Sequence, residues 1–285
     1  MKQELAAIVN AAENPVTGGN LAREYLQARI LLVLQETGSF VPLAFQGGTA
    51  LRFLYDLPRF SEDLDFALER PGRGAFELED ACRRIASRLG REGYAVHATP
   101  RTGQAVARAN VAFPGLPHEL GLSPHADQVL RIRLEVDMRP PTGATLETTI
   151  VRRHVLLNLQ HHDRASLLAG KLHAILQRQW VKGRDLFDLF WYLSDPRWPG
   201  PNLDLLNNAL RQTQWEGPDL DENEWRPAVR ERVAALDWAA AEQDVAPFLE
   251  PGPGTSLFQR ENLLGLLDRE QQAFSRPPAA PPSGP

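Results

Sequence analysis

The run from Gly47 to Phe66 constrains the fold of this chain more than any other segment. A Gly-Gly-Thr turn follows the apolar run VPLAFQ and precedes ALRFLYDL, and SEDLDFAL comes after Pro58. The apolar run and SEDLDFAL predict strands, whereas ALRFLYDL predicts a short helix that ends at the proline, because proline disfavours a helical residue before it. We therefore expect a strand, a glycine turn, a helix and a second strand, in that order.

Two carboxylates lie two residues apart in the second predicted strand. Residues at this spacing project from the same face of a strand, so Asp63 and Asp65 are expected to point together into solvent or a cleft. Carboxylate oxygens suit a hard cation such as Mg²⁺ (or Mn²⁺), which commonly lies between protein carboxylates and substrate phosphates. Asp63 and Asp65 are therefore the predicted metal ligands.

The glycine turn is a predicted phosphate site. Gly47 and Gly48 have no Cβ to block the approach of a phosphate to backbone N–H groups, and the start of a helix adds a favourable partial positive charge. Thr49 can add a hydroxyl donor. Arg59 and Ser61, just before the acidic strand, are further candidate nucleotide contacts, although a surface role fits them equally well.

The segment RIRLEVDMR has the clearest strand pattern in the chain. Its apolar residues alternate strictly with charged ones, which indicates one core face and one charged face. A second metal that activates a hydroxyl needs a further carboxylate on a neighbouring strand. Glu135 is the preferred third metal ligand, and Asp137, on the same face, is the alternative.

Composition excludes several classes of protein. The chain has 285 residues, a formal net charge of −5 and a single cysteine, Cys82. The negative charge argues against coating of nucleic acid by bulk electrostatics, and one cysteine cannot form a disulfide framework. No apolar run approaches the ~20 residues that span a bilayer. We expect a cytoplasmic protein that makes no membrane contact.

The pattern of predicted secondary structure changes near residue 150. Strand-like and helix-like segments are mixed before this point, and helix-like sequence dominates from about residue 164. We expect a catalytic domain over 1–150, a helical domain over 151–274 and a disordered proline-rich tail over 275–285.

Two blocks of sequence resemble a known family. FQGGTALRFLYDLPRFSEDLDFAL is similar to the first motif of AbiEii/AbiGii-type toxins, a branch of the DNA polymerase β superfamily of nucleotidyltransferases that includes the MenT toxins. SLLAGKLHAILQRQWVKGRDLFDLFWYL is similar to the second block of that family, in which a lysine on a helix precedes an Arg-Asp-x-x-Asp element. The resemblance covers about residues 40–195.

The resemblance implies an α+β fold, with a polymerase β-like mixed sheet, flanking helices and a mainly helical C-terminal lobe. It also implies phosphate contacts from Gly48 and Thr49, and metal binding by the two aspartates already described. In the second block it implies that Lys171 contacts nucleotide phosphates and that Asp185 and Asp188 form an essential acidic pair. Relatives act as toxins with a cognate antitoxin, and some transfer nucleotides to the 3′ end of tRNA.

The spacing of the second block agrees with these roles. Lys171, Arg178 and Lys182 are seven and four residues apart, so they would share one face of a continuous helix, with Asp185 near the same stripe. A solvated face with ion pairs would give the same pattern. Gly183 weakens a continuous helix and is compatible with a bend toward a cleft.

These features predict a nucleotidyltransferase that moves a nucleoside monophosphate from a nucleoside triphosphate to a hydroxyl, with release of pyrophosphate. Glu135 would orient or deprotonate the hydroxyl, and Lys171 would offset triphosphate charge. The expected acceptor is the 3′ end of tRNA; a small molecule such as an antibiotic, or a protein, is an alternative acceptor. A non-catalytic nucleotide-binding module is the other alternative. Local arginine groups are candidate RNA contacts or solvated faces: Arg83, Arg84, Arg88, Arg91, Arg152 and Arg153.

Overall fold

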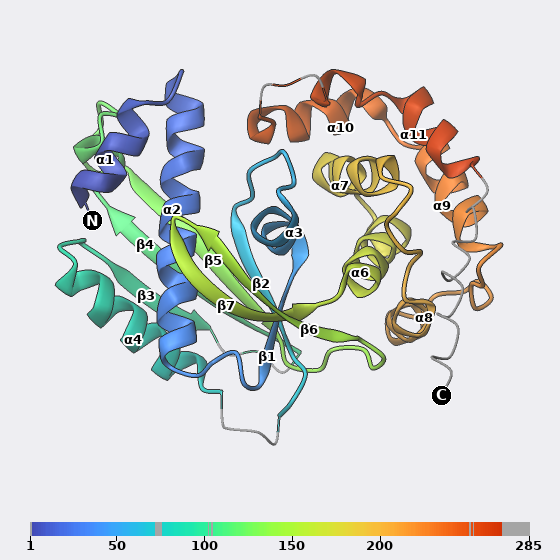
Figure 1. The fold of residues 1–285 in the computed structure, drawn as a ribbon, viewed down its shortest axis with the longest axis horizontal. Coiled ribbons are helices and arrows are strands. Elements are labelled where there is room, and N and C mark those ends of the chain that lie inside the picture. The colour runs from blue at the N-terminus through green and yellow to red at the C-terminus, as the bar shows by residue number, and fades with distance from the viewer. Residues whose placement is uncertain are drawn as a thin grey trace, which may run out of the picture.

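A computed structural model describes residues 2–71, 76–101, 103, 105–250, 252 and 254–269. A seven-stranded mixed sheet forms its centre, in the order β3-β4-β5-β2-β1-β7-β6 (Figure 1). The strands are β1 (Leu43–Gln46), β2 (Asp63–Leu68), β3 (His97–Arg101), β4 (Val106–Pro114), β5 (Val129–Asp137), β6 (Leu146–Arg153) and β7 (Val155–His162). The predicted tail, 275–285, lies outside the described residues.

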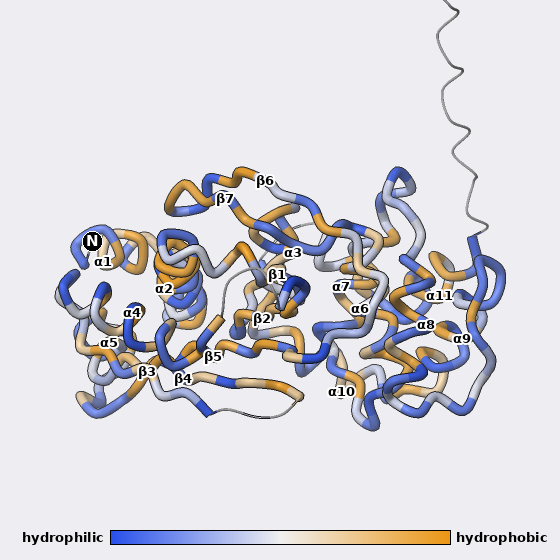
Figure 2. Tube along the Cα trace, turned by 90° about the horizontal axis from the view of Figure 1, so that it is seen from below, coloured by the Kyte–Doolittle hydropathy of each residue, from blue (hydrophilic) through white to orange (hydrophobic). Residues whose placement is uncertain are grey.

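Helices precede, interrupt and follow the sheet. In the first half of the chain they are α1 (Lys2–Asn10), α2 (Pro15–Glu36), α3 (Gly47–Tyr55), α4 (Leu78–Arg91) and α5 (Leu116–Glu119). After the sheet come α6 (Arg164–Gln177), α7 (Gly183–Ser194), α8 (Leu203–Gln212), α9 (Trp225–Ala234), α10 (Trp238–Val245) and α11 (Arg260–Leu267), with 3-10 turns η1 (Ala246–Phe248) and η2 (Thr255–Leu257). Figure 2 shows that α6 to α11 gather at the end of the molecule away from the N-terminus.

Local sequence explains where the main helices begin. Asn14 caps α2 by accepting a hydrogen bond from the Thr17 N–H, and Pro15 occupies the first turn, where its missing N–H costs nothing. Asp163 caps α6 in the same way by accepting from the Ser166 N–H at 2.8 Å. The first helix after the sheet is therefore fixed in place by a local signal.

The alternation in β5 separates a core face from a polar face. Ile132, Leu134 and Val136 are buried, whereas Arg131 and Arg133 are exposed. Helices α2 and α4 lie on one side of the sheet, and α3 lies next to β1 and β2 (Figure 1). The expected α+β architecture, a mixed sheet with flanking helices followed by a mainly helical lobe, is confirmed.

The sheet extends further along the chain than expected. Position 150 falls inside β6, and β7 pairs with β1 in the interior of the sheet through Phe45 and His161. The division into 1–150 and 151–274 stays a prediction. We propose that the helical lobe begins at Arg164, because the sheet ends at His162.

Among the residues placed by the structure, no helix has both the length and the apolar content needed to cross a membrane.

Candidate active site

Strands β2 and β5 bring together the carboxylates that the sequence singled out. The two strands are parallel neighbours, and Asp65 is the register partner of Glu135. The register partner of Asp137 is Ala67, further along the strand. Register partners share a face of the sheet, so Glu135 is the carboxylate next to Asp65. The geometry therefore favours Glu135 over Asp137 as the third carboxylate.

The glycine turn lies directly against this pair. Helix α3 starts at Gly47, whose φ of +78° is readily adopted only by glycine. A Cβ on Gly47 would lie 2.3 Å from Asp65 Oδ2, so the carboxylate occupies the space that any side chain would fill. The preceding residue, Gln46, makes no side-chain capping bond to α3. The start of the helix and the carboxylate thus face the same volume.

Thr49 does not face that volume, contrary to the expected phosphate contact. Its side chain is fully buried, and its hydroxyl donates to the main-chain carbonyl of Asp63. The threonine hydroxyl therefore ties α3 to β2. Its predicted role as a phosphate donor is corrected to a structural one, because the hydroxyl proton is already used.

The Asp65 carboxyl has an unusual protonation equilibrium. Burial and the neighbouring charges of Asp63 and Glu135 raise the pKa of Asp65 to about 7, against the opposing effect of Lys171. Like charges held together in a partly desolvated place disfavour ionisation of one another. A cation at this point would relieve that repulsion, which fits a carboxylate set built for a positively charged ligand.

Arginines on the same face hold the other two carboxylates. Arg133 Nε donates to Asp63 Oδ1 at 2.9 Å, and Arg108 Nε donates to Glu135 Oε1 at 3.3 Å. Within the described part of the chain, no three acidic, histidine or cysteine side chains are arranged to hold a metal ion. The donor chemistry fits Mg²⁺ or Mn²⁺, since all candidate ligands are carboxylate oxygens. Asp63 would have to turn away from Arg133 to join such a set.

The second sequence block forms two helices rather than one. Helix α6 ends at Gln177 and α7 begins at Gly183, so the expected continuous helix through Lys171, Arg178 and Lys182 is wrong. Arg232 from α9 satisfies a carbonyl at the break, because its Nη2 donates to the Arg178 carbonyl at 2.7 Å after the last turn of α6.

Gly183 is required at the start of α7 for a different reason from the predicted bend. A Cβ at this position would lie 1.8 Å from the Ala241 carbonyl oxygen of α10. Glycine thus allows α10 to pack against the first turn of α7.

Lys171 stands between two aspartates of α7. Its Nζ lies 3.0 Å from Asp185 Oδ1 and 2.6 Å from Asp188 Oδ2. Burial alone would lower the pKa of Lys171, but Asp188 and Asp185 outweigh it and the pKa lies above its ordinary value. The pKa of Asp185 lies below its usual range, since Lys171 and Arg178 overcome the effect of burial. The lysine is therefore a fixed cation.

The two aspartates of this block differ in position. Asp185 lines the cavity described below, whereas Asp188 is fully buried outside its lining and accepts two hydrogen bonds from Arg59. The Arg59 guanidinium also donates to the Phe60 carbonyl at 2.8 Å. Asp188 and Arg59 thus hold the lobes together, with Arg59 against Gly48, where a Cβ would be 2.4 Å from its Nη2.

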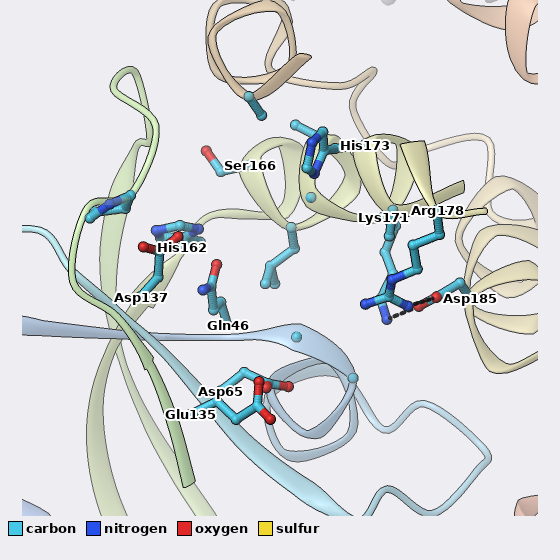
Figure 3. A pocket seen from close by; sticks show the side chains of 18 of the residues that line it. Gln46, Asp65, Glu135, Asp137, His162, Ser166, Lys171, His173, Arg178 and Asp185 are labelled. Atoms are coloured by element: carbon cyan, nitrogen blue, oxygen red, sulfur yellow. Dashed lines mark hydrogen bonds and ion pairs between the residues drawn. The ribbon is translucent and has the colours of Figure 1, made fainter. Parts of the chain in front are cut away.

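One cavity of about 740 Å³ joins the two blocks (Figure 3). Asp65 and Glu135 enter it from the sheet, and Lys171, Arg178 and Asp185 enter it from the helices. Most of the predicted site residues line it together: Gly47, Gly48, Arg59, Ser61, Asp63, Asp65, Glu135, Lys171, Arg178, Lys182 and Asp185. The carboxylates of Asp65 and Glu135 form an acidic floor on the sheet side, and Lys171 and Arg178 form a cationic wall on the side of the helical lobe. This is the charge arrangement that a metal-bound triphosphate requires.

Comparison with known proteins agrees with this arrangement. The family model for the nucleotidyl transferase AbiEii toxins of type IV toxin–antitoxin systems matches residues 29–270. The chain belongs to the AbiEii family. The resemblance seen in the two sequence blocks is therefore confirmed, and the family is one of nucleotidyltransferase toxins. No curated protein matches the chain.

Solved structures support the AbiEii fold. MenT4, a nucleotidyltransferase toxin from Mycobacterium tuberculosis H37Rv, is 19% identical with a TM-score of 0.59, over 94% of this chain and 88% of that one. A Helicobacter pylori protein assigned as a nucleotidyltransferase is 18% identical with a TM-score of 0.51, over 87% and 90% of the two chains. At these identities the likeness concerns the fold alone.

The structure adds residues to the AbiEii site that were not among the predicted metal and nucleotide contacts. Arg133, Gln46 and Arg184 line the cavity, and Arg184 Nη1 lies 3.0 Å from Glu62 Oε2. Arg133 had a signal in the sequence, since the alternation of β5 places it on the face of Glu135. Arg184 had one too, because it is the arginine of the Arg-Asp-x-x-Asp element, whereas Gln46 had none beyond its neighbours.

Most of the arginines suggested as RNA contacts are engaged within the AbiEii fold. Asp80 pairs with Arg83 and Arg84, Glu92 pairs with Arg88, and Asp56 pairs with Arg153 at 2.8 Å. These charges are largely compensated, so they do not form a free cationic surface.

Proposed function

We propose that this AbiEii toxin transfers a nucleoside monophosphate from a nucleoside triphosphate to a hydroxyl group and releases pyrophosphate. One observation carries the proposal: the neighbouring carboxylates of Asp65 and Glu135 face the fixed cation Lys171 across a single cavity beside a bare glycine turn. A pure nucleotide-binding site has no need of adjacent carboxylates whose ionisation is mutually opposed.

The proposed nucleotide contacts come from backbone N–H groups and from positively charged side chains. The backbone N–H groups of Gly47 and Gly48 at the start of α3 are the proposed phosphate contacts on one side of the cavity, and Lys171 with Arg178 offsets triphosphate charge from the other side. Lys182 and Ser61 border the same cavity and are the remaining proposed nucleotide contacts. Asp185 holds Lys171 and Arg178 in place by accepting hydrogen bonds from both.

The reaction forms one bond and breaks one bond at the α-phosphorus. The acceptor oxygen bonds to that phosphorus, and the bond to the oxygen that bridges to the β-phosphate breaks, so pyrophosphate departs. Glu135 orients the acceptor hydroxyl and receives its proton. Positioning supplies most of the acceleration, because phosphoryl-type transfer needs little covalent chemistry from the protein.

We propose Mg²⁺, or Mn²⁺, as the cofactor, held by Asp63, Asp65 and Glu135. When bound, the cation neutralises phosphate charge and lowers the pKa of a coordinated hydroxyl. For Asp63 to bind the cation, its carboxylate has to separate from Arg133, whose Nε lies 2.9 Å from Asp63 Oδ1.

We further propose the 3′ end of tRNA as acceptor and a cognate antitoxin as partner. The toxin family supports the antitoxin, since its members belong to type IV toxin–antitoxin systems, and the tRNA acceptor rests on the resemblance of the two sequence blocks to toxins that modify tRNA. The identity of the acceptor can be tested separately from the transfer reaction.

Labelling measures the proposed function directly. The purified chain is incubated with each α-³²P nucleoside triphosphate, Mg²⁺ and, separately, total RNA, an aminoglycoside mixture and cell lysate protein. We expect label in the tRNA band, and loss of at least about a hundredfold in rate for Asp65→Asn and for Glu135→Gln. Asp80→Asn, an exposed carboxylate of α4, is the matched control.

Each outcome bears on the proposal. Label in the aminoglycoside or protein fraction alone would replace the acceptor and keep the transferase. Bound nucleotide without pyrophosphate release in all three fractions, or equal labelling by Asp65→Asn, would remove the transferase mechanism.

A further inference from the structure

A second cavity of about 580 Å³ adjoins the candidate active site. Both cavities are lined by Asp63 and Arg133, so this ion pair stands at their junction. The second cavity lies between the first turns of α2 and the start of β5, and it also receives Arg23 and Arg131. The two cavities therefore form neighbouring volumes that meet at a proposed metal ligand.

The polar face of three strands leads away from this junction toward the sheet edge. Across this face Arg133 is the register partner of Asn110, and Glu135 is the partner of Arg108, which in turn pairs with Arg101 on the edge strand β3. The arginines on this face are Arg101, Arg108, Arg131 and Arg133. Among the described residues of β3 and β4, this face carries no acidic side chain, and its acidic residues on β5 are Glu135 and Asp137, at the end of the strand that reaches the first cavity.

Two of these arginines have no internal counter-charge. Arg101 and Arg131 are exposed, and neither forms an ion pair within the described residues. Arg83 and Arg84, on the helix that covers the opposite face, are both paired with Asp80. In a chain of net charge −5, uncompensated arginines gathered on one face form a local positive surface.

Arg23 has one guanidinium donor that the fold leaves without a partner. Its Nη1 donates to Asn20 Oδ1 at 3.2 Å and its Nη2 lies 3.9 Å from Glu62, which also lines the second cavity, but its Nε is buried without a hydrogen-bond partner. Burial lowers the pKa of Arg23, which its acidic neighbours do not offset. A buried donor without an acceptor costs free energy. An anionic ligand in the second cavity would supply that acceptor.

We infer that the second cavity, which Arg23 lines, and the arginine face, composed of Arg101, Arg108, Arg131 and Arg133, bind the phosphate backbone of a single-stranded RNA end. This inference rests on the proposed function and adds the path of its acceptor. The RNA end crosses the Asp63–Arg133 junction, and its terminal hydroxyl enters the first cavity beside Glu135.

The shape of the arginine face selects a polyanionic strand rather than a second nucleotide. The arginines extend over three adjacent strands, a width of roughly 10 Å, which exceeds the reach of a single phosphate. The glycine turn and Lys171, which suit a triphosphate, belong to the first cavity alone. Nucleotide and acceptor thus have separate charged surfaces.

Binding measurements with the full chain test the inference. The probes are a fluorescein-labelled single-stranded RNA and a fluorescent nucleoside triphosphate, each followed by anisotropy. We expect Arg131→Gln and Arg101→Gln to weaken RNA binding about three- to tenfold each, and to lower the slope of its salt dependence by roughly 0.7 for each phosphate that is no longer neutralised. Triphosphate binding should stay within twofold of wild type. Arg84→Gln, with the same charge change on α4, should leave both unchanged.

Three results would overturn the inference: unchanged RNA affinity in both variants, an equal loss in Arg84→Gln, or a loss of triphosphate affinity as large as that of RNA affinity. Arg23→Gln adds a second readout, because removal of its unpartnered donor should weaken RNA binding without lowering the melting temperature.

The two proposals fail separately. If RNA is labelled by wild type but Arg131→Gln and Arg101→Gln keep the wild-type KM for RNA, only the acceptor path is wrong. If RNA binds as expected but neither RNA nor another acceptor is labelled, the transferase mechanism is wrong and the RNA surface remains.

Discussion

Arg59 and Asp188 form a buried, bidentate ion pair between the loop before β2 and helix α7. Arg59 Nε and Nη2 lie 2.6 and 2.5 Å from the two carboxylate oxygens of Asp188, and the side chains are 2% and 0% exposed. Lys171 approaches the same carboxylate at 2.6 Å. The pair joins residues 129 positions apart, one from each sequence block. It therefore fixes the cationic wall of the cavity relative to the acidic floor.

This geometry separates the two aspartates of α7. Asp188→Ala leaves Arg59 buried without a counter-charge, so we expect it to lower the free energy of unfolding by about 3–5 kcal/mol. Asp185→Ala should cost about 1–2 kcal/mol, because Lys171 keeps Asp188 and the half-exposed Arg178 can be hydrated. Urea denaturation monitored by tryptophan fluorescence measures both.

The activities should differ as well. The Asp185→Ala variant should stay folded yet bind nucleoside triphosphate more weakly. It removes the hydrogen-bond acceptor of Arg178 and one of the two carboxylates that hold Lys171. Equal stability losses in the two variants would contradict the structural role given to Asp188.

Asp65 should destabilise the metal-free protein at neutral and alkaline pH. Its pKa of about 7 in the folded chain lies above the ordinary 3.8, so the folded state binds more protons and stability falls as pH rises from about 4 to 7. Asp65→Asn removes this penalty. In the presence of EDTA we expect the variant to be more stable than wild type by about 1–2 kcal/mol at pH 8, with the gain vanishing near pH 4.

Thermal unfolding of both proteins across that pH range measures the effect. Asp80→Asn provides a control of opposite sign, because a hydrogen bond from Arg84 lowers the pKa of Asp80. A variant at position 65 that gains nothing at pH 8 would show that the Asp65 carboxylate is not under electrostatic stress.

Gly47 should tolerate no side chain. Gly47→Ala combines a positive φ, which costs about 1–2 kcal/mol for an alanine, with a Cβ 2.3 Å from Asp65 Oδ2. Displacement of that carboxylate should reduce RNA labelling by about a hundredfold. Gly90→Ala is the matched control: it lies in α4 with open space around it, and should leave labelling intact while stabilising by up to about 1 kcal/mol.

Arg133 should compete with the divalent cation for Asp63. Arg133→Gln removes the guanidinium, whose pKa is raised by its pair with Asp63, so the carboxylate becomes free to turn toward Asp65. We expect Mn²⁺ affinity, measured by electron paramagnetic resonance without nucleotide, to rise by up to about fivefold. Unchanged or weaker Mn²⁺ binding would argue against Asp63 as a ligand, and Arg84→Gln controls for net charge.

The parts of the site that could be predicted from sequence depend on local rules. The alternation of strands put Asp63 with Asp65, and Glu135 with Asp137, because side chains two apart share a face whatever the rest of the chain does. The glycine turn predicted the close approach of a phosphate for a similar local reason; the structure places the Asp65 carboxylate against Gly47, and the phosphate contact stays a prediction. The helix from Arg164 was expected, and its capping Asp163 accounts for its start.

Tertiary structure decided which of these groups meet in the cavity and which form hydrogen bonds or ion pairs inside the fold. Pairing of β2 with β5 set Glu135 beside Asp65, and strand register between distant segments is not encoded in either segment alone. The Thr49 hydroxyl, the break after α6 and the burial of Asp188 depend on partners far along the chain. Sequence therefore supplied the chemical groups and their local faces, whereas long-range packing determined their partners, because hydrogen bonds and charge compensation follow distance in space.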